Sequence, residues 1–343
     1  MALDVPAEPA TEAATPQPAT TRRQLSAGLQ YQADLEPALV ALSALARAAL
    51  GRPTWVMPFS VAALTRASRD WLLDVHHQPA AGDKQTDPRA QGIRNTFRAF
   101  QELDTRYGGG YARLALVQHL TANVLPLLGS ASKDVQEAGA ELLYLAGLMA
   151  FDDGALGLAE CYLIQALRLS QEAGSRSFAA NTVAAMAHLA VFAGYGEEAV
   201  RLARVGLAGA PEAENPAVRM RLFAMKARGH ALTGDSAGCT SDLSSAEAAL
   251  GEAGSATEPD WARFLDLAFL AGEMSLCFRD LHQEKAAERF ALESIKASNG
   301  RGRRRVLSQA TRRSPPREPS PAGCRTCRRS VRPKTRGAFK PSA

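Results

Sequence analysis

Aromatic residues make up only 6% of this 343-residue sequence, although 46% of it is apolar. Alanine and leucine supply most of the apolar surface, and β-branched residues are scarce. Because Ala and Leu favour helices and β-branched residues favour strands, this composition predicts an all-α protein. No apolar run of about 18 residues occurs, so no membrane span is expected. The N-terminus lacks the apolar core of a signal peptide, and we therefore expect a cytoplasmic protein.

Motifs of metal binding and catalysis are also lacking. The 5 cysteines show neither a disulfide framework nor metal-ligand spacing. Cys324 and Cys327 form a CxxC pair, but no second pair of ligands lies nearby to complete a zinc site. The glycines at 108–110 are not followed by the Lys and Ser or Thr of a phosphate loop. We therefore expect no metal, no cofactor and no enzymatic activity.

The charge of the chain is distributed unevenly. Residues 301–343 carry fourteen Lys or Arg and one acid, whereas the first 300 residues carry 26 Lys or Arg and 34 Asp or Glu. Residues 1–30 and this basic Arg/Pro/Ser tail both have the composition of disordered segments. The tail has a single aromatic residue, so we expect DNA contact to be indirect, through a partner, or weak, through the charge of the tail.

Helical periodicity covers the rest of the chain. Residues 31–80 form an N-terminal helical segment, and residues 88–300 form a longer helical domain punctuated by glycine. The predicted helices are 35–50, 60–75, 91–106, 111–128, 132–150, 155–173, 177–193, 196–209, 216–233, 236–251, 258–279 and 283–298.

An internal repeat organises the longer domain. Small residues recur at steps of 40 at the start of every second helix, and again seven residues later. They are Ala159, Ala199 and Cys239, followed by Ala166, Gly206 and Ala246. Close crossing of the two helices of a hairpin requires such residues, and Gly147, Ala187 and Ala227 supply them on the first helices. The pattern resembles the tetratricopeptide (TPR) repeat and implies a TPR-like α-solenoid of antiparallel helix pairs; the alternative is an Ala-rich helical bundle.

The first helices of such a solenoid line its concave surface, where ligands bind. Its two arginines would suit an acidic or carboxylate-bearing peptide. Taken singly, each residue also fits an ordinary half-buried packing position. The residues expected to face this groove are Glu141, Tyr144, Asn181, His188, Arg221 and Arg228.

Several longer stretches carry a closer resemblance. They are PFSVAALTRASRDWLLD (58–74), ELDTRYGGGYARLALVQHL (102–120), YLAGLMAFDDGALGLAECYLIQALRLSQEAG (144–174), AMKARGHALTGD (224–235) and EPDWARFLDLAFLAGEMSLCFRDL (258–281). Over roughly residues 30–310 the chain resembles the TPR-containing, helix-turn-helix-associated regulators of streptomycete-type bacteria, often called sporulation-associated proteins. The resemblance implies a regulatory scaffold for a protein or peptide partner, linked to transcription or development. The alternative is a sensor of a small peptide or metabolite.

The sequence departs from that family at both ends. No helix-turn-helix pattern precedes residue 30, so we expect the chain to act through a partner or to be a truncated regulator. After about Ser308 the helical pattern gives way to the basic tail, which we interpret as an out-of-frame reading of a GC-rich gene. The last repeat would then lack a cap, and we expect exposed apolar surface near Phe290 and Ile295 and self-association there.

Overall fold

The computed structural model describes residues 28–51, 58–75, 86–210, 215–253 and 259–298. Helices joined by turns and loops make up these residues, and none of them forms a strand, so the predicted all-α class is confirmed. The basic tail at 301–343, with Cys324 and Cys327, lies outside the described residues. So does the expected disordered segment, except for residues 28–30.

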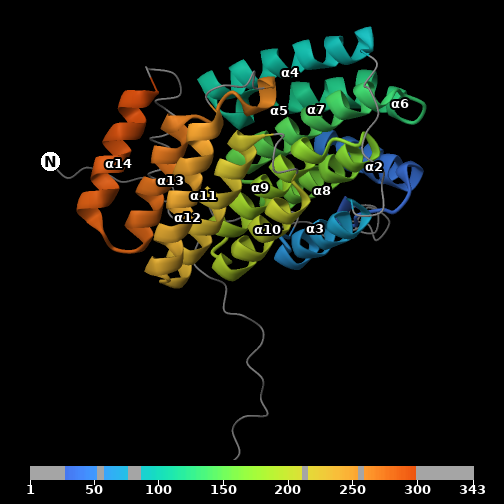
Figure 1. Cartoon of the computed structure of the whole chain (residues 1–343). Helices are drawn as coiled ribbons and strands as arrows, with labels where there is room; N and C mark the ends of the chain where they lie inside the picture. Colours follow the sequence, from blue (N-terminus) through green and yellow to red (C-terminus); the bar gives the residue numbers. More distant parts are fainter. Residues whose placement is uncertain (1–27, 52–57, 76–85, 211–214, 254–258, 299–343) are drawn as a thin grey trace, which may run out of the picture.

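The helices follow the predicted order (Figure 1). Their bounds are α2 Leu35–Gly51, α3 Val61–Val75, α4 Pro88–Tyr107, α5 Gly109–His119, a π-helical turn Leu120–Val124, α6 Leu125–Leu128, α7 Lys133–Asp152, α8 Leu156–Glu172, α9 Arg176–Phe192, α10 Gly196–Gly209, α11 Pro216–Thr233, α12 Ser236–Ala253, a 3-10 turn Asp260–Ala262, α13 Leu267–Asp280 and α14 Glu284–Ala297.

Consecutive helices pack as pairs: α4 with α5, α7 with α8, α9 with α10, α11 with α12, and α13 with α14. The first helix of each pair contacts the first helix of the next pair. The second helix of a pair contacts the first helix of the following pair. We call the surface formed by α4, α7, α9, α11 and α13 the first-helix layer. Polar side chains on these five helices are therefore brought together although they are far apart in the sequence.

One turn geometry recurs at the predicted period. Gly154, Gly194 and Gly234 each end the first helix of a pair with φ near +80°. In each turn the residue after the glycine donates its N–H to the carbonyl five residues earlier, at 2.9 Å. This bond satisfies a terminal helix carbonyl, and the positive φ favours glycine. The step of 40 residues is thus confirmed at these turns, and His282, with φ 57°, ends the first helix of the last pair.

Small residues allow the helix backbones to approach. A Cβ on Gly147 of α7 would lie 3.1 Å from the Leu163 side chain and 3.4 Å from the Ala159 carbonyl oxygen of α8. The approach of α10 to α11 is closer, because a Cβ on Gly229 would lie 2.6 Å from the Gly196 carbonyl oxygen. The predicted crossing positions on both helices of these pairs are all buried.

The N-terminal helices cover the other side of the pairs. Helix α2 packs on α5 and α8, and α3 packs on α8 and α10 (Figure 1). Polar side chains of α8 hold the residues that precede α2. The Gln165 side chain donates to the Gly28 carbonyl at 3.0 Å, and Arg168 donates to the Gln32 carbonyl at 2.6 Å. Trp71 of α3 is fully buried against Gly209, where a Cβ would lie 2.3 Å from the indole ring.

The sequence prediction for the helix at 258–279 is wrong at its start. The helix predicted at 258–279 begins only at Leu267, because Asp266 accepts a hydrogen bond from the Phe269 N–H and caps α13 there. Pro259 and the 3-10 turn after it form a separate segment. In the last pair, Phe290 is buried against Phe278 with ring centroids 5.3 Å apart, and Ile295 is half-buried. Leu292 lies between them in the sequence and is exposed, so exposed apolar surface does lie near both residues, and self-association there stays a prediction.

We predict that Gly229→Ala destabilises the fold by about 1–3 kcal/mol, because the added methyl overlaps the backbone of α10. Gly92→Ala is the matched control, since Gly92 lies in α4 with nothing within 4 Å of the added Cβ. There we expect a gain of about 0.5–1 kcal/mol from helix propensity. Urea unfolding followed by circular dichroism measures both, and equal stability of the two variants would contradict the close approach of α10 and α11.

Candidate functional site

The six predicted groove residues all lie in the first-helix layer. Glu141 and Tyr144 belong to α7, Asn181 and His188 to α9, and Arg221 and Arg228 to α11. The structure gathers them into three polar clusters, described below. All of them except His188 are buried, with exposed fractions of 5% or less. Their contact with a ligand stays a prediction, because a buried side chain can touch a ligand only after the groups that cover it have moved away.

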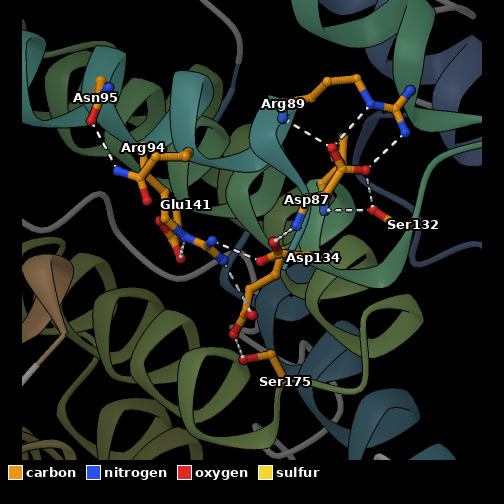
Figure 2. A network of polar contacts seen from close by, with 11 residues as sticks. Asp87, Arg89, Arg94, Asn95, Ser132, Asp134, Glu141 and Ser175 are labelled. Atoms are coloured by element: carbon orange, nitrogen blue, oxygen red, sulfur yellow. Dashed lines mark hydrogen bonds and ion pairs between the residues drawn. The ribbon is translucent and has the colours of Figure 1, made fainter. Parts of the chain in front are cut away.

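The first cluster centres on Arg94 of α4, which no sequence motif identified (Figure 2). Its guanidinium pairs with three carboxylates of α7: Asp134 at 2.7 Å, Glu141 at 3.3 Å and Glu137 at 3.4 Å. These acids recur at intervals of three and four residues and so share one face of the helix. Ser175, just before α9, donates a hydrogen bond to Glu137. The cluster therefore ties α4 and the start of α9 to α7.

The capping residues of α4 and α7 extend this cluster. Asp87 caps α4 by accepting a hydrogen bond from the Arg89 N–H at 2.9 Å. Its own N–H donates to Asp134 at 2.8 Å, and its carboxylate accepts a hydrogen bond from Ser132, the cap of α7, at 2.8 Å. Both helix starts are thereby fixed to each other, as Figure 2 shows.

Negative charge outweighs positive charge around Arg94. One guanidinium faces three carboxylates, and burial of a carboxylic acid disfavours its charged form. Burial raises the pKa of Glu141 to about 7; the neighbouring Arg94 lowers it, and Glu137 raises it further. Glu141 therefore takes up a proton near neutral pH in the folded chain.

The second cluster surrounds Arg221. Its guanidinium donates to the Tyr144 hydroxyl at 2.6 Å and to the side-chain oxygen of Asn181 at 2.6 Å. The ring of Phe264 lies 5.4 Å from the guanidinium carbon. Arg221 thus links α7, α9 and α11 through neutral groups.

The third cluster surrounds Arg228, two turns further along α11. Arg228 pairs with Glu273 at 3.0 Å and with Asp280 at 3.3 Å, both from α13. His188 of α9 lies 3.9 Å from Glu273 and makes an edge contact with the ring of Phe151. This cluster joins α9, α11 and α13.

A segment of the chain itself lies on the first-helix layer. Residues 259–266, which we call the covering segment, reach from α13 back toward α4 (Figure 1). Asp260 pairs with Arg98 of α4 at 2.6 Å. Trp261, only 5% exposed, packs edge-on against Phe178 of α9 with ring centroids 5.1 Å apart. The covering segment accounts for part of the burial of the predicted groove residues.

Comparison with models of protein families, with curated proteins and with solved structures finds no significant match. Within the described ranges no helix is long and apolar enough to span a membrane. The same ranges contain no group of three or more His, Cys, Asp or Glu side chains arranged to hold a metal ion.

We predict that Arg94→Ala destabilises the protein by about 3 kcal/mol or more, because it leaves three carboxylates without their shared cation. Arg106→Ala removes an exposed pair with Glu102 within α4 and is expected to cost less than about 0.5 kcal/mol. Denaturant unfolding at neutral pH measures both, and a small loss for Arg94→Ala would show that the cluster is unimportant for stability.

We predict that Glu141→Gln changes how stability depends on pH. The pKa of Glu141 is raised in the folded chain, so its contribution to stability is greatest below about pH 4.5 and declines as the pH rises to about 7. The free energy of unfolding of the wild type should therefore fall relative to Glu141→Gln by up to about 3 kcal/mol across that window. Urea titrations of both proteins from pH 4 to 8 test this; parallel curves would contradict the raised pKa.

Proposed function

We propose that this chain is a TPR-like α-solenoid whose first-helix layer lines a concave surface and binds a segment of a partner protein. Two observations support the solenoid: each helix pair packs on the next in one repeated arrangement, and the same turn recurs every 40 residues. The function proposed is that of a cytoplasmic, non-enzymatic binding scaffold.

The covering segment is the observation that carries this proposal. It is a short, largely non-helical stretch, and its acidic and aromatic side chains contact α4, α9 and α11. A surface that holds such a stretch of its own chain has the shape and chemistry to hold one from another chain. Alpha-solenoids bind peptides on the surface lined by their first helices.

The regulatory part of the proposal rests on the resemblance to sporulation-associated regulators. In that setting the scaffold acts on transcription or development through its partner, and any contact with DNA is indirect or weak. A sensor of small peptides or metabolites is the second candidate. The brevity of the covering segment favours this candidate, because a short ligand would suffice to replace it.

We predict that a peptide spanning residues 259–266 binds in trans to a Trp261→Ala/Phe264→Ala chain. These changes weaken the internal segment by removing its two aromatic contacts with the layer. Fluorescence anisotropy with a labelled peptide should show saturable one-to-one binding, weaker or absent with the wild-type chain. Circular dichroism checks that the variant is folded.

Two charge-reversal variants serve as controls for this experiment, one on α4 beside the covering segment and one on α2. Adding Arg98→Glu removes the partner that α4 supplies to Asp260 and should weaken peptide binding about tenfold. Adding Arg47→Glu makes the same charge change on an exposed residue of α2 and should leave binding unchanged. If a folded variant does not bind the peptide, or if both charge changes act equally, the proposed function is wrong.

A further inference from the structure

Arg221 is a buried cation whose described surroundings supply no opposite charge. It is 4% exposed, and its partners among the described residues are the Tyr144 hydroxyl, the Asn181 oxygens and two aromatic rings. Among the residues that the structure describes, no carboxylate lies within 4.0 Å of it. Burying a charge without a counter-charge is costly, so this arrangement calls for an explanation.

The same cluster holds two buried donors without acceptors. Nε of Arg221 and Nδ2 of Asn181 are both buried and have no hydrogen-bond partner among the described atoms. Buried polar groups in proteins are normally satisfied, and both of these groups donate. What the cluster lacks is therefore an acceptor, and an anionic acceptor would also supply the missing charge.

Arg228 shows that the lack of an opposite charge is local, although its Nε also has no hydrogen-bond partner among the described atoms. It lies seven residues after Arg221 on α11 and is equally buried, yet two carboxylates of α13 pair with it. The first-helix layer thus satisfies one arginine with its own acids. It covers the other with Phe264 of the covering segment, at 5.4 Å.

Aromatic contacts connect the covering segment to the Arg221 cluster. Trp261 packs against Phe178, Phe178 packs against Tyr144 with ring centroids 5.5 Å apart, and the Tyr144 hydroxyl accepts a hydrogen bond from Arg221. The covering segment therefore contacts the Arg221 cluster at two positions. Trp261 contacts it through Phe178, and Phe264, three residues later, contacts Arg221 itself.

We propose that the covering segment is an internal occupant that a partner segment displaces, and that the partner carries an acidic side chain where Phe264 lies. The partner places an aromatic residue in the position of Trp261 and, three residues later, a carboxylate that pairs with Arg221. An acidic residue just before the aromatic one takes the place of Asp260 on Arg98. This inference rests on the proposed function and specifies which partner the surface selects.

The preference for an acidic side chain follows from the strengths of the two contacts. A ring near a guanidinium gives a cation–π attraction, whereas a carboxylate gives charge-assisted hydrogen bonds that are stronger in a buried setting. The internal segment gains from being tethered to the same chain, so it occupies the surface in the absence of a partner. A partner with the carboxylate compensates for the missing tether through Arg221.

The test compares three amidated peptides on the Trp261→Ala/Phe264→Ala chain: residues 259–266, and the same peptide with Phe264→Glu or Phe264→Gln. We expect the Phe264→Glu peptide to bind about tenfold more tightly than the isosteric Phe264→Gln peptide. This difference should disappear when Arg221→Met is added to the protein, while binding of the unchanged peptide persists.

The outcomes separate the two proposals. If none of the peptides binds the folded variant, the proposed function fails. If the unchanged peptide binds but Phe264→Glu gives no gain over Phe264→Gln, or the gain survives Arg221→Met, the inference about Arg221 is overturned while the proposed function stands.

A double-mutant cycle in the otherwise unchanged chain gives a second measurement. It does not require the covering segment to leave the first-helix layer. Arg221→Met is introduced into the wild type and into a Phe264→Glu chain, and the unfolding equilibrium constant is measured for all four proteins. We expect Arg221→Met to raise that constant at least about tenfold more in the Phe264→Glu chain. Equal effects in the two chains would overturn the inference.

Discussion

The close approach of helix backbones within and between pairs is the constraint on which this structure depends. Where Gly196 of α10 meets Gly229 of α11, a methyl group on either residue would overlap the facing backbone. The recurring turns at Gly154, Gly194 and Gly234 then return the chain with the same backbone geometry in three consecutive pairs. Because these contacts repeat, the first helices come to lie side by side, and residues 40 or more positions apart become neighbours. The polar clusters exist only because this arrangement brings their members together.

Burial of charge follows from that arrangement. The first helices face each other and the covering segment, so Arg94, Arg221 and Arg228 are removed from most of the surrounding water. Removing a charge from water is costly unless a partner is present. Around Arg94 three carboxylates face one guanidinium, and burial, with a smaller contribution from Glu137, raises the pKa of Glu141 to about 7. Two carboxylates face Arg228, whereas no carboxylate of the described residues lies within 4.0 Å of Arg221. The layer thus contains one site with surplus negative charge and another with a deficit.

Much of the helical framework could be predicted from the sequence, because its determinants are local. Glycine after each first helix, and small residues at fixed steps, predict the turns and crossings that the structure shows. The environment of the predicted groove residues could not be obtained in that way. Arg94 lies 47 residues before Glu141, and Phe264 lies 43 residues after Arg221, so no single periodic pattern contains both partners. The apolar spacing of 258–279 suggested one long helix, since the buried side chains of a docked segment resemble those of a helix face. Pro259 and the capping side chain of Asp266 were the local signals of the true boundary.

The position of the covering segment gives its displacement a structural consequence. Asp266, its last residue, caps α13, and α13 carries both Glu273 and Asp280, which neutralise Arg228. Movement of Phe264 away from Arg221 therefore acts on the start of the helix that holds the third cluster. Glu273 also lies beside His188 of α9, so a shift of α13 changes the polar contacts between the last three first helices. A partner that replaces the segment would gain the Arg221 pairing and at the same time alter how α13 and α14 sit on the preceding pair. Under the proposed function, binding of a partner on the first-helix layer would in this way be coupled to the packing of the last helix pair, which is the property that a regulatory scaffold requires.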